Sequence, residues 1–306
     1  MIEIRRILCP IDFSDFSRRA LDYAVAIANW YDSAVTLCHV AAVAPTAAYG
    51  PGDPILPSML LTQEDREQLL ESMKTFAAAE AGSSVRLQFE VAQGTAATEI
   101  LAQADEMRAD LLVMGTHGRS GFERLVLGSV TEKVLRTATC AVLSVPRLAH
   151  DAVPAVLFKR ILCAVDFSDC SMHALDYAVS LAQQARGELT VVHALELEPE
   201  LPPGLHETVI GGPVSLAEYI EAAENDCRER LKSAVPDGVR AQCSVTTMLL
   251  KGKAYREILR VALEEGSDVI VIGIHGRGAM DLMFFGSTAQ HVVRQASCPV
   301  LTLRTG

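Results

Sequence analysis

The strongest constraint on the fold of this chain is that its sequence occurs twice. Residues 5–28 are RRILCPIDFSDFSRRALDYAVAIA and residues 159–182 are KRILCAVDFSDCSMHALDYAVSLA, with two thirds of the positions identical. Further paired segments follow in the same order: 34–40 with 188–194, 91–101 with 249–259, 108–118 with 266–276, and 132–145 with 290–303. A repeat of about 145 residues indicates a duplicated domain rather than a short-period solenoid. We predict domains at 1–146 and 159–306, joined by a linker over 147–158.

Within each copy, short apolar runs alternate with helical patterns. In the first copy we expect strands at 7–11, 35–40, 85–91, 110–114 and 141–145, and helices that begin after Ser14 or Asp15, at Thr62, at Ala97 and at Ser129. In the second copy, Ser215 and Glu218 have the spacing of a capping box, which predicts a helix start. Alternation of this kind predicts an α/β fold, with a parallel sheet covered by helices on both faces.

The composition excludes several classes of protein. The net charge is -11 at pH 7, so we expect no binding to nucleic acid, which requires a basic surface. The chain has no leader-like opening and no apolar run of ~18 residues, so we expect a cytoplasmic protein that does not enter membranes. The eight cysteines lack zinc-ligand spacing, which predicts buried reduced thiols and no metal site of their own.

A glycine motif also occurs in both copies, as GTHGRSGFERLVLGS from Gly115 to Ser129 and as GIHGRGAMDLMFFGS from Gly273 to Ser287. Its first glycine ends a predicted strand, and its final glycine and serine begin a predicted helix. The free N–H groups of a helix start favour an anion, and glycines let the backbone approach a ligand closely. The serine hydroxyl can cap the helix or donate to a phosphate oxygen. The alternative is that these glycines only end a strand and begin a helix.

Asp12 and Asp166 follow the first strand of each copy, where a carboxylate can accept from ribose hydroxyls or help to hold Mg²⁺. The alternative is a helix cap, although Asp15 and Asp169, three residues later, fit that role better. Arg119 and Arg277, next to the second glycine of the motif, are either phosphate partners or solvated surface arginines.

These motifs resemble those of the universal stress protein family, in its ATP-binding branch. The resemblance covers nearly the whole chain, as two such domains in tandem. It implies a Rossmann-like domain of the adenine nucleotide α-hydrolase type in each half, with a five-stranded sheet ordered 3-2-1-4-5. It also implies ATP between the first and fourth strands, with adenine at the end of the second strand.

The resemblance also implies the residues that contact the nucleotide. In the first copy they are Pro10, Asp12, the Val40 backbone, Met114, Gly115, Gly118, Gly128, Ser129, Val130 and Thr131. In the second copy they are Ala164, Asp166, Ala194, Ile272, Gly273, Gly276, Gly286, Ser287, Thr288 and Ala289. The second copy has alanine in place of Pro10, and Thr288 and Ala289 in place of Val130 and Thr131. We therefore expect the first site to be nearer the family pattern and the second to bind with altered affinity.

The fifth strand of an isolated domain would be an exposed apolar edge. The resemblance implies that fifth strands pair across a dimer interface, so we expect the two copies to pair with each other as an intramolecular pseudo-dimer. Whether the chain also forms a homodimer stays open.

The sequence contains no phosphate-binding G-x4-G-K-[ST] loop, no kinase motif set and no G-x-S-x-G element. We expect the histidines near the motifs, such as His39 and His117, to be structural. We therefore expect a nucleotide-binding regulatory or protective protein of the stress response, with no catalytic residues and at most slow ATP hydrolysis. Two alternatives stay open: an interaction protein that binds no nucleotide, and an adenylate-transferring enzyme of a related fold.

Overall fold

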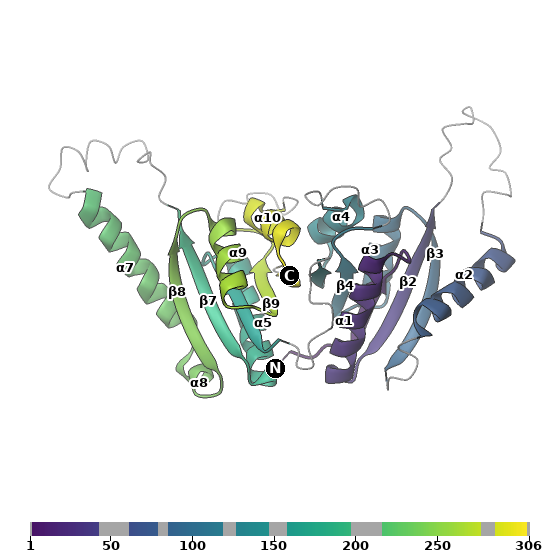
Figure 1. The fold of residues 1–306 in the computed structure, drawn as a ribbon, viewed down its shortest axis with the longest axis horizontal. Coiled ribbons are helices and arrows are strands. Elements are labelled where there is room, and N and C mark those ends of the chain that lie inside the picture. The colour runs from purple at the N-terminus through teal and green to yellow at the C-terminus, as the bar shows by residue number, and fades with distance from the viewer. Residues whose placement is uncertain are drawn as a thin grey trace, which may run out of the picture.

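The computed structural model describes residues 2–42, 61–78, 85–118, 127–146, 158–196, 216–276 and 285–304. Within these residues the chain forms a single ten-stranded sheet in the order β3-β2-β1-β4-β5-β10-β9-β6-β7-β8. Each half therefore contributes five neighbouring strands in the order 3-2-1-4-5, as the resemblance implied. Figure 1 shows the two halves on either side of the centre of the sheet, with β3 and β8 toward its two outer ends.

The first half alternates strands and helices as predicted. Its elements are β1 (Arg6–Pro10), α1 (Asp15–Tyr31), β2 (Ala34–Ala42), α2 (Gln63–Phe76), β3 (Arg86–Gly94), α3 (Ala96–Glu106), β4 (Leu111–Gly115), α4 (Ser129–Thr137) and β5 (Ala141–Val145). The predicted limits of the fifth strand are exact and those of the other strands differ by one to three residues, mainly because β2 and β3 pair beyond the apolar runs, as far as Ala42 and Gly94.

The second half repeats this order and adds a short helix before its third strand. Its elements are β6 (Arg160–Ala164), α5 (Asp169–Ala185), β7 (Glu188–Leu195), α7 (Leu216–Ala234), α8 (Asp237–Arg240), β8 (Ser244–Lys251), α9 (Ala254–Glu264), β9 (Val269–Gly273), α10 (Ser287–Gln295) and β10 (Val300–Leu303). Strands within each half are parallel. The prediction of a parallel α/β sheet in each copy is confirmed.

Helices cover both faces of the sheet, because successive side chains of a strand point to opposite faces. On β1, Ile7 and Cys9 pack with residues of α1 in one core, whereas Leu8 packs with residues of α3 and α4 in the other. Each core contains residues from both halves. The two halves therefore share their hydrophobic interior.

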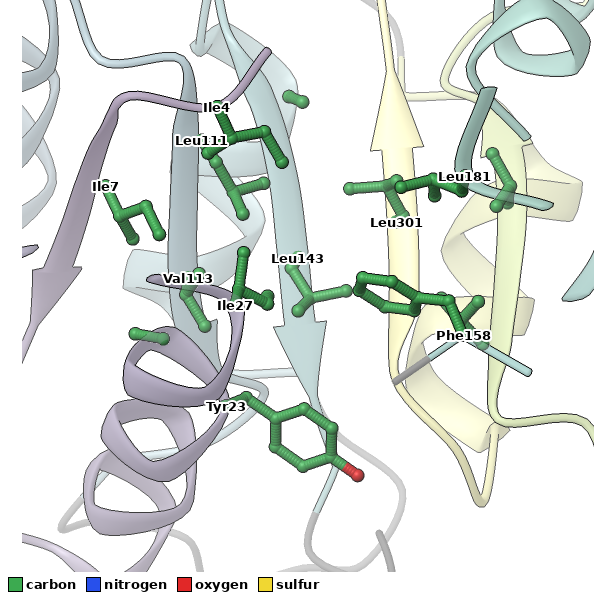
Figure 2. Close-up of a cluster of buried hydrophobic side chains, with 14 of the residues drawn as sticks. Ile4, Ile7, Tyr23, Ile27, Leu111, Val113, Leu143, Phe158, Leu181 and Leu301 are labelled. Atoms are coloured by element: carbon green, nitrogen blue, oxygen red, sulfur yellow. The ribbon is translucent and has the colours of Figure 1, made fainter. Parts of the chain in front are cut away.

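The halves join where β5 and β10 run antiparallel, with Leu143 opposite Leu301. Two buried hydroxyls strengthen the join, since Ser144 donates to the Val300 carbonyl at 3.1 Å and Thr302 to the Val142 carbonyl at 3.2 Å. Figure 2 shows Leu143 and the Phe158 ring pointing toward one another across the join. The prediction that the fifth strands of the two copies pair with each other is confirmed.

Several local predictions are corrected by the structure. Ser14 and Ser168 cap α1 and α5, each accepting from the N–H group three residues later at 3.3 Å, so Asp15 and Asp169 are first-turn residues and not caps. Phe158, assigned to the linker, is buried and belongs to the core. The rest of the linker, 147–157, and Ser215 of the predicted capping box lie outside the described residues.

All eight cysteines are free thiols and seven of them are buried, in agreement with the prediction. Burial, with Asp22 and Cys38 nearby, raises the pKa of Cys9 far above its ordinary value, and burial with Asp105 nearby raises that of Cys140 to about 11. These thiols are therefore protonated at neutral pH. Among the helices in the described part of the chain, none is long and apolar enough to cross a membrane.

Candidate functional site

Each half contains a cavity where the strand order reverses, between β1 and β4 in the first half and between β6 and β9 in the second. The first cavity has a volume of about 280 Å³ and the second about 450 Å³. Both lie at the carboxyl ends of their strands, where open α/β sheets bind ligands. Volumes of this size are typical of small-molecule sites.

The start of α4 forms one end of the first cavity. The first bond within this helix runs from the Glu132 N–H to the Gly128 carbonyl at 2.9 Å, so the N–H groups of Ser129, Val130 and Thr131 precede it. In the second half, Gln290 donates to Gly286 at 2.9 Å, and Ser287 to Ala289 occupy the same positions. Open N–H groups together with the helix dipole make each helix start a suitable anion site.

The structure separates the two roles predicted for the serine. Gly128 and Gly286 are the N-cap residues, and neither α4 nor α10 has a side-chain cap. Ser129 and Ser287 are the first helical residues and are exposed beside the open N–H groups. Their hydroxyls therefore do not cap the helix, and donation to a ligand stays a prediction.

The loop after β1 holds the Asp12 carboxylate in a fixed position. Its Oδ1 accepts from the Ser14 N–H at 3.1 Å and from the Ser14 hydroxyl at 2.5 Å, while Ser17 accepts from the Asp12 N–H at 3.4 Å. Asp166 makes the same contacts with Ser168 and Ser171. The next residues, Phe13 and Phe167, have φ of 64° and 63°, a left-handed conformation that costs such residues ~1–3 kcal/mol. Both copies therefore retain a strained turn that positions one carboxylate.

Two glycines of each motif are required by close packing. A Cβ on Gly118 would lie 2.7 Å from the Asp12 Oδ2, and one on Gly276 would lie 2.7 Å from the Asp166 Oδ2. A Cβ on Gly115 would lie 2.8 Å from the Phe16 Cβ, in the first turn of α1. The second glycine thus brings the loop after β4 against the carboxylate, whereas the first brings the end of β4 against α1. The glycines were predicted to let the backbone approach a ligand closely. The structure shows that they also let it approach other protein atoms.

The other end of the first cavity is largely apolar, with Pro10, Cys38, Val40, Ile100 and Met114 in its wall. Burial, with Glu90 and Glu99 nearby, raises the pKa of Cys38 to about 12, so this wall carries no thiolate. The Ile11 N–H donates to the Cys38 carbonyl at 2.8 Å, and the β1–β2 register ends at Pro10 and Cys38. Backbone groups alternate in direction along a strand, so the N–H and C=O of Val40, two residues after Cys38, point to the same side of β2 as the Cys38 carbonyl. They therefore face the space beyond the end of β1. A flat ring here would meet apolar walls and one backbone donor–acceptor pair.

The two cavities differ beside the helix start. In the first, the buried Thr131 hydroxyl donates to the Gly115 carbonyl at 3.0 Å, which ties α4 to the end of β4. The Thr131 hydroxyl is thus used within the protein, while its N–H group remains at the helix start. Ala289 takes this place in the second half and has no hydroxyl to donate to Gly273. The difference between Thr131 and Ala289 that the sequence showed therefore lies in the cavity wall.

The structure brings nearly all the predicted site residues together. In the first half they line one cavity: Pro10, Asp12, Val40, Met114, Gly115, Gly118, Gly128, Ser129, Val130 and Thr131. In the second half they line the other: Ala164, Asp166, Ala194, Ile272, Gly273, Gly276, Gly286, Ser287, Thr288 and Ala289. Arg119 and Arg277 lie outside the described residues.

The sequence analysis missed several residues of the cavity walls: Ser17, Cys38, Ala96 and Ile100 in the first half, and Ser171, Val192, Ala254, Ile258 and Phe285 in the second. Ser17 and Ser171 could have been found, because they follow the aspartate at the same distance in both copies. His39 and His117 also line the first cavity. Their Nδ1 atoms lie 2.9 Å from the Ile11 carbonyl and 3.0 Å from the Thr116 hydroxyl, respectively, and their structural role stays a prediction.

The model of the universal stress protein family matches this chain twice, over residues 3–146 and 157–304. The chain belongs to the universal stress protein family. A universal stress protein of Methanocaldococcus jannaschii is 39% identical over 144 residues, which are 47% of this chain and 82% of that protein. One from Mycolicibacterium smegmatis is 26% identical over 314 residues, covering 97% of this chain and 96% of its own length.

A solved universal stress protein of Archaeoglobus fulgidus shares the fold along the whole chain, with a TM-score of 0.71, 22% sequence identity, and 100% of each chain covered. A universal stress protein solved in complex with cAMP aligns with 47% of this chain at 26% identity and a TM-score of 0.35. This universal stress protein therefore has the tandem arrangement that the repeat predicts, in a fold that a solved relative shares from end to end.

Proposed function

We propose that this universal stress protein binds one adenine nucleotide in each half, with the phosphates at the start of α4 or α10 and the base at the end of β2 or β7. The observation that carries the proposal is the composition of the two cavities. Each combines open helix N–H groups, a fixed carboxylate and an apolar wall, on three neighbouring strands. From β4 to β2 is two strand spacings, ~10 Å, a distance that a nucleoside can bridge.

The available hydrogen bonds are sufficient for useful affinity. Three N–H groups and the Ser129 hydroxyl can donate to one phosphate chain. At ~1.5–3 kcal/mol for each charge-assisted bond, they approach the ~8 kcal/mol that a micromolar site requires. The Asp12 carboxylate lines the same cavity, where it can accept from ribose. It can also ligate Mg²⁺, which binds through one or two carboxylates and the substrate phosphates.

The proposal is a binding and regulatory role rather than rapid catalysis. Among the described residues of the first cavity wall, Asp12 is the one carboxylate. We assign it to the ribose or to Mg²⁺, and a carboxylate engaged in that way does not serve as the general base for an attacking water. Slow ATP hydrolysis at most is therefore proposed, and a cytoplasmic stress-response role stays a prediction that cell fractionation can test.

Nucleotide released from the purified protein by acid, separated by chromatography, tests the proposal directly. We expect an adenine nucleotide, with up to two equivalents per chain. Calorimetric titration of stripped protein with ATP, ADP, AMP and cAMP then measures the preference. A stripped protein that binds none of these at millimolar concentration would contradict the proposal and favour an interaction protein that uses no nucleotide.

A further inference from the structure

The helices α4 and α10 each start at a cavity, and one matching position on them carries a different side-chain charge in the two halves. It is Lys133 on α4 and His291 on α10, which match in the repeat. Each lies four residues after the serine at the helix start, and residues i and i+4 share a helix face. Helical side chains also lean toward the N-terminus, so both residues lean toward the first turn of their helix, just outside the residues that line each cavity.

Contacts in the structure support this placement. The His291 Nδ1 lies 2.7 Å from the Ser287 carbonyl, so its ring reaches back to the helix start. The Tyr255 ring of α9 stacks on it, with ring centroids 4.4 Å apart. In the first half, the Lys133 Nζ lies 3.4 Å from the Thr98 hydroxyl of α3, which brings the ammonium to the gap between α3 and α4. Lys133 is exposed and makes no ion pair with any described residue.

We infer that Lys133 and His291 set the number of phosphates that each half prefers, an inference that rests on the proposed nucleotide binding. One helical turn, ~5.4 Å, separates each residue from the serine before it. A group at that distance meets the outer phosphates rather than the phosphate held by the N–H groups. Lys133 places a permanent positive charge there. His291 offers a weaker partner, because its Nδ1 hydrogen bonds to the Ser287 carbonyl and its ring is stacked on Tyr255.

The first half therefore favours ATP over AMP more strongly than the second half does. The experiment isolates each site in the full chain by calorimetry at pH 8. Gly276→Ala silences the second site and Gly118→Ala the first, because each new Cβ would lie 2.7 Å from the aspartate Oδ2. We expect the ratio of ATP affinity to AMP affinity to be roughly threefold to tenfold higher at the first site.

The decisive variants exchange the two residues. Lys133→His should lower ATP affinity at the first site by about threefold to tenfold and leave AMP affinity unchanged. His291→Lys should raise ATP affinity at the second site by a similar factor. Lys74→His is the matched control, because Lys74 pairs with Glu71 at 2.6 Å on α2, a helix that lines neither cavity, whereas α4 and α10 begin at the cavities.

The outcomes separate this inference from the proposed function. If neither isolated site binds ATP or AMP, the proposed function fails. If both nucleotides bind but the ratio is the same at the two sites, or the exchange leaves it unchanged, the inference is overturned and nucleotide binding stands. Circular dichroism confirms that the variants fold. Should Lys133→His misfold, Lys133→Gln removes the same charge and must give the same loss.

Discussion

The first and second cavities share one scaffold but have different walls. Both have a helix start that no side chain caps, an aspartate held by a serine, and a glycine against that aspartate. They differ at Thr131 against Ala289 and at Lys133 against His291, and their volumes are about 280 Å³ and 450 Å³. The duplicated chain has thus kept the features that we propose to position a phosphate, while the residues around them have diverged. Two sites with unequal affinity are the expected result.

The largest expected effect tests what the cavities share. Gly118→Ala and Gly276→Ala each place a Cβ 2.7 Å from a carboxylate oxygen, so the loop or the aspartate must move. Each variant should weaken ATP binding in its own half at least tenfold, and calorimetry should show one site instead of two. Gly238→Ala is the control, since its Cβ meets nothing within 4 Å. Two unchanged sites in Gly118→Ala would contradict the role of this contact.

The next effect concerns a contact found in the first half alone. Thr131→Val keeps the side-chain shape but removes the hydroxyl that donates to the Gly115 carbonyl at 3.0 Å. The buried carbonyl loses its donor, so we expect the free energy of unfolding in urea to fall by ~1–3 kcal/mol. Ala289→Thr should supply the missing donor in the second half and reduce its cavity. An unchanged unfolding free energy for Thr131→Val would show that this bond does not distinguish the halves.

A smaller effect is expected at the serines. Ser129→Ala and Ser287→Ala should each leave stability within ~0.5 kcal/mol, because neither hydroxyl caps its helix. ATP affinity in the same half should fall about threefold to tenfold through loss of one phosphate donor. Ser14→Ala is the contrasting variant, since it removes a true cap and should cost ~1 kcal/mol of stability. Loss of stability without loss of affinity in Ser129→Ala would reverse this assignment.

The smallest effect is electrostatic. The Glu196 Oε1 accepts from the Ala254 N–H at 2.7 Å at the start of α9, which lines the second cavity, whereas the first half has Ala42 at this position. Glu196→Gln removes a negative charge from the rim and should strengthen ATP binding in the second half about twofold at low salt. The gain should disappear at high salt, because exposed charges are then screened. Equal gains in both halves would argue against a local effect.

Much of the fold could be predicted because the same pattern of strands and helices occurs in both copies of the repeat. Alternating apolar runs predicted the strands and their parallel pairing, and the repeat located the domains. Helix caps were harder, because Ser14 and Asp15 are both good caps and only backbone geometry places Ser14 at the cap. The α8 helix was missed because it has only four residues, too short for a periodic pattern.

The residues of the candidate site that could be predicted are those whose type is fixed by close packing. Gly118 and Asp12 must fit against one another, so both remain in both copies. Apolar wall residues such as Ile100 were missed, because an apolar residue in a helix indicates burial without indicating which cavity it borders. The bond between Thr131 and Gly115 could not be foreseen, since a hydroxyl at a helix start can serve a ligand or the backbone equally well.

The antiparallel pairing of β5 with β10 has a further consequence for how the molecule behaves on dilution. A pair made from separate chains comes apart as its concentration falls, whereas covalent connection keeps the local concentration of the partner high at any protein level. Here the two unlike halves are always present in equal number and always in contact. A change in the amount of this protein therefore changes the number of each kind of half, but the ratio of first halves to second halves stays one to one.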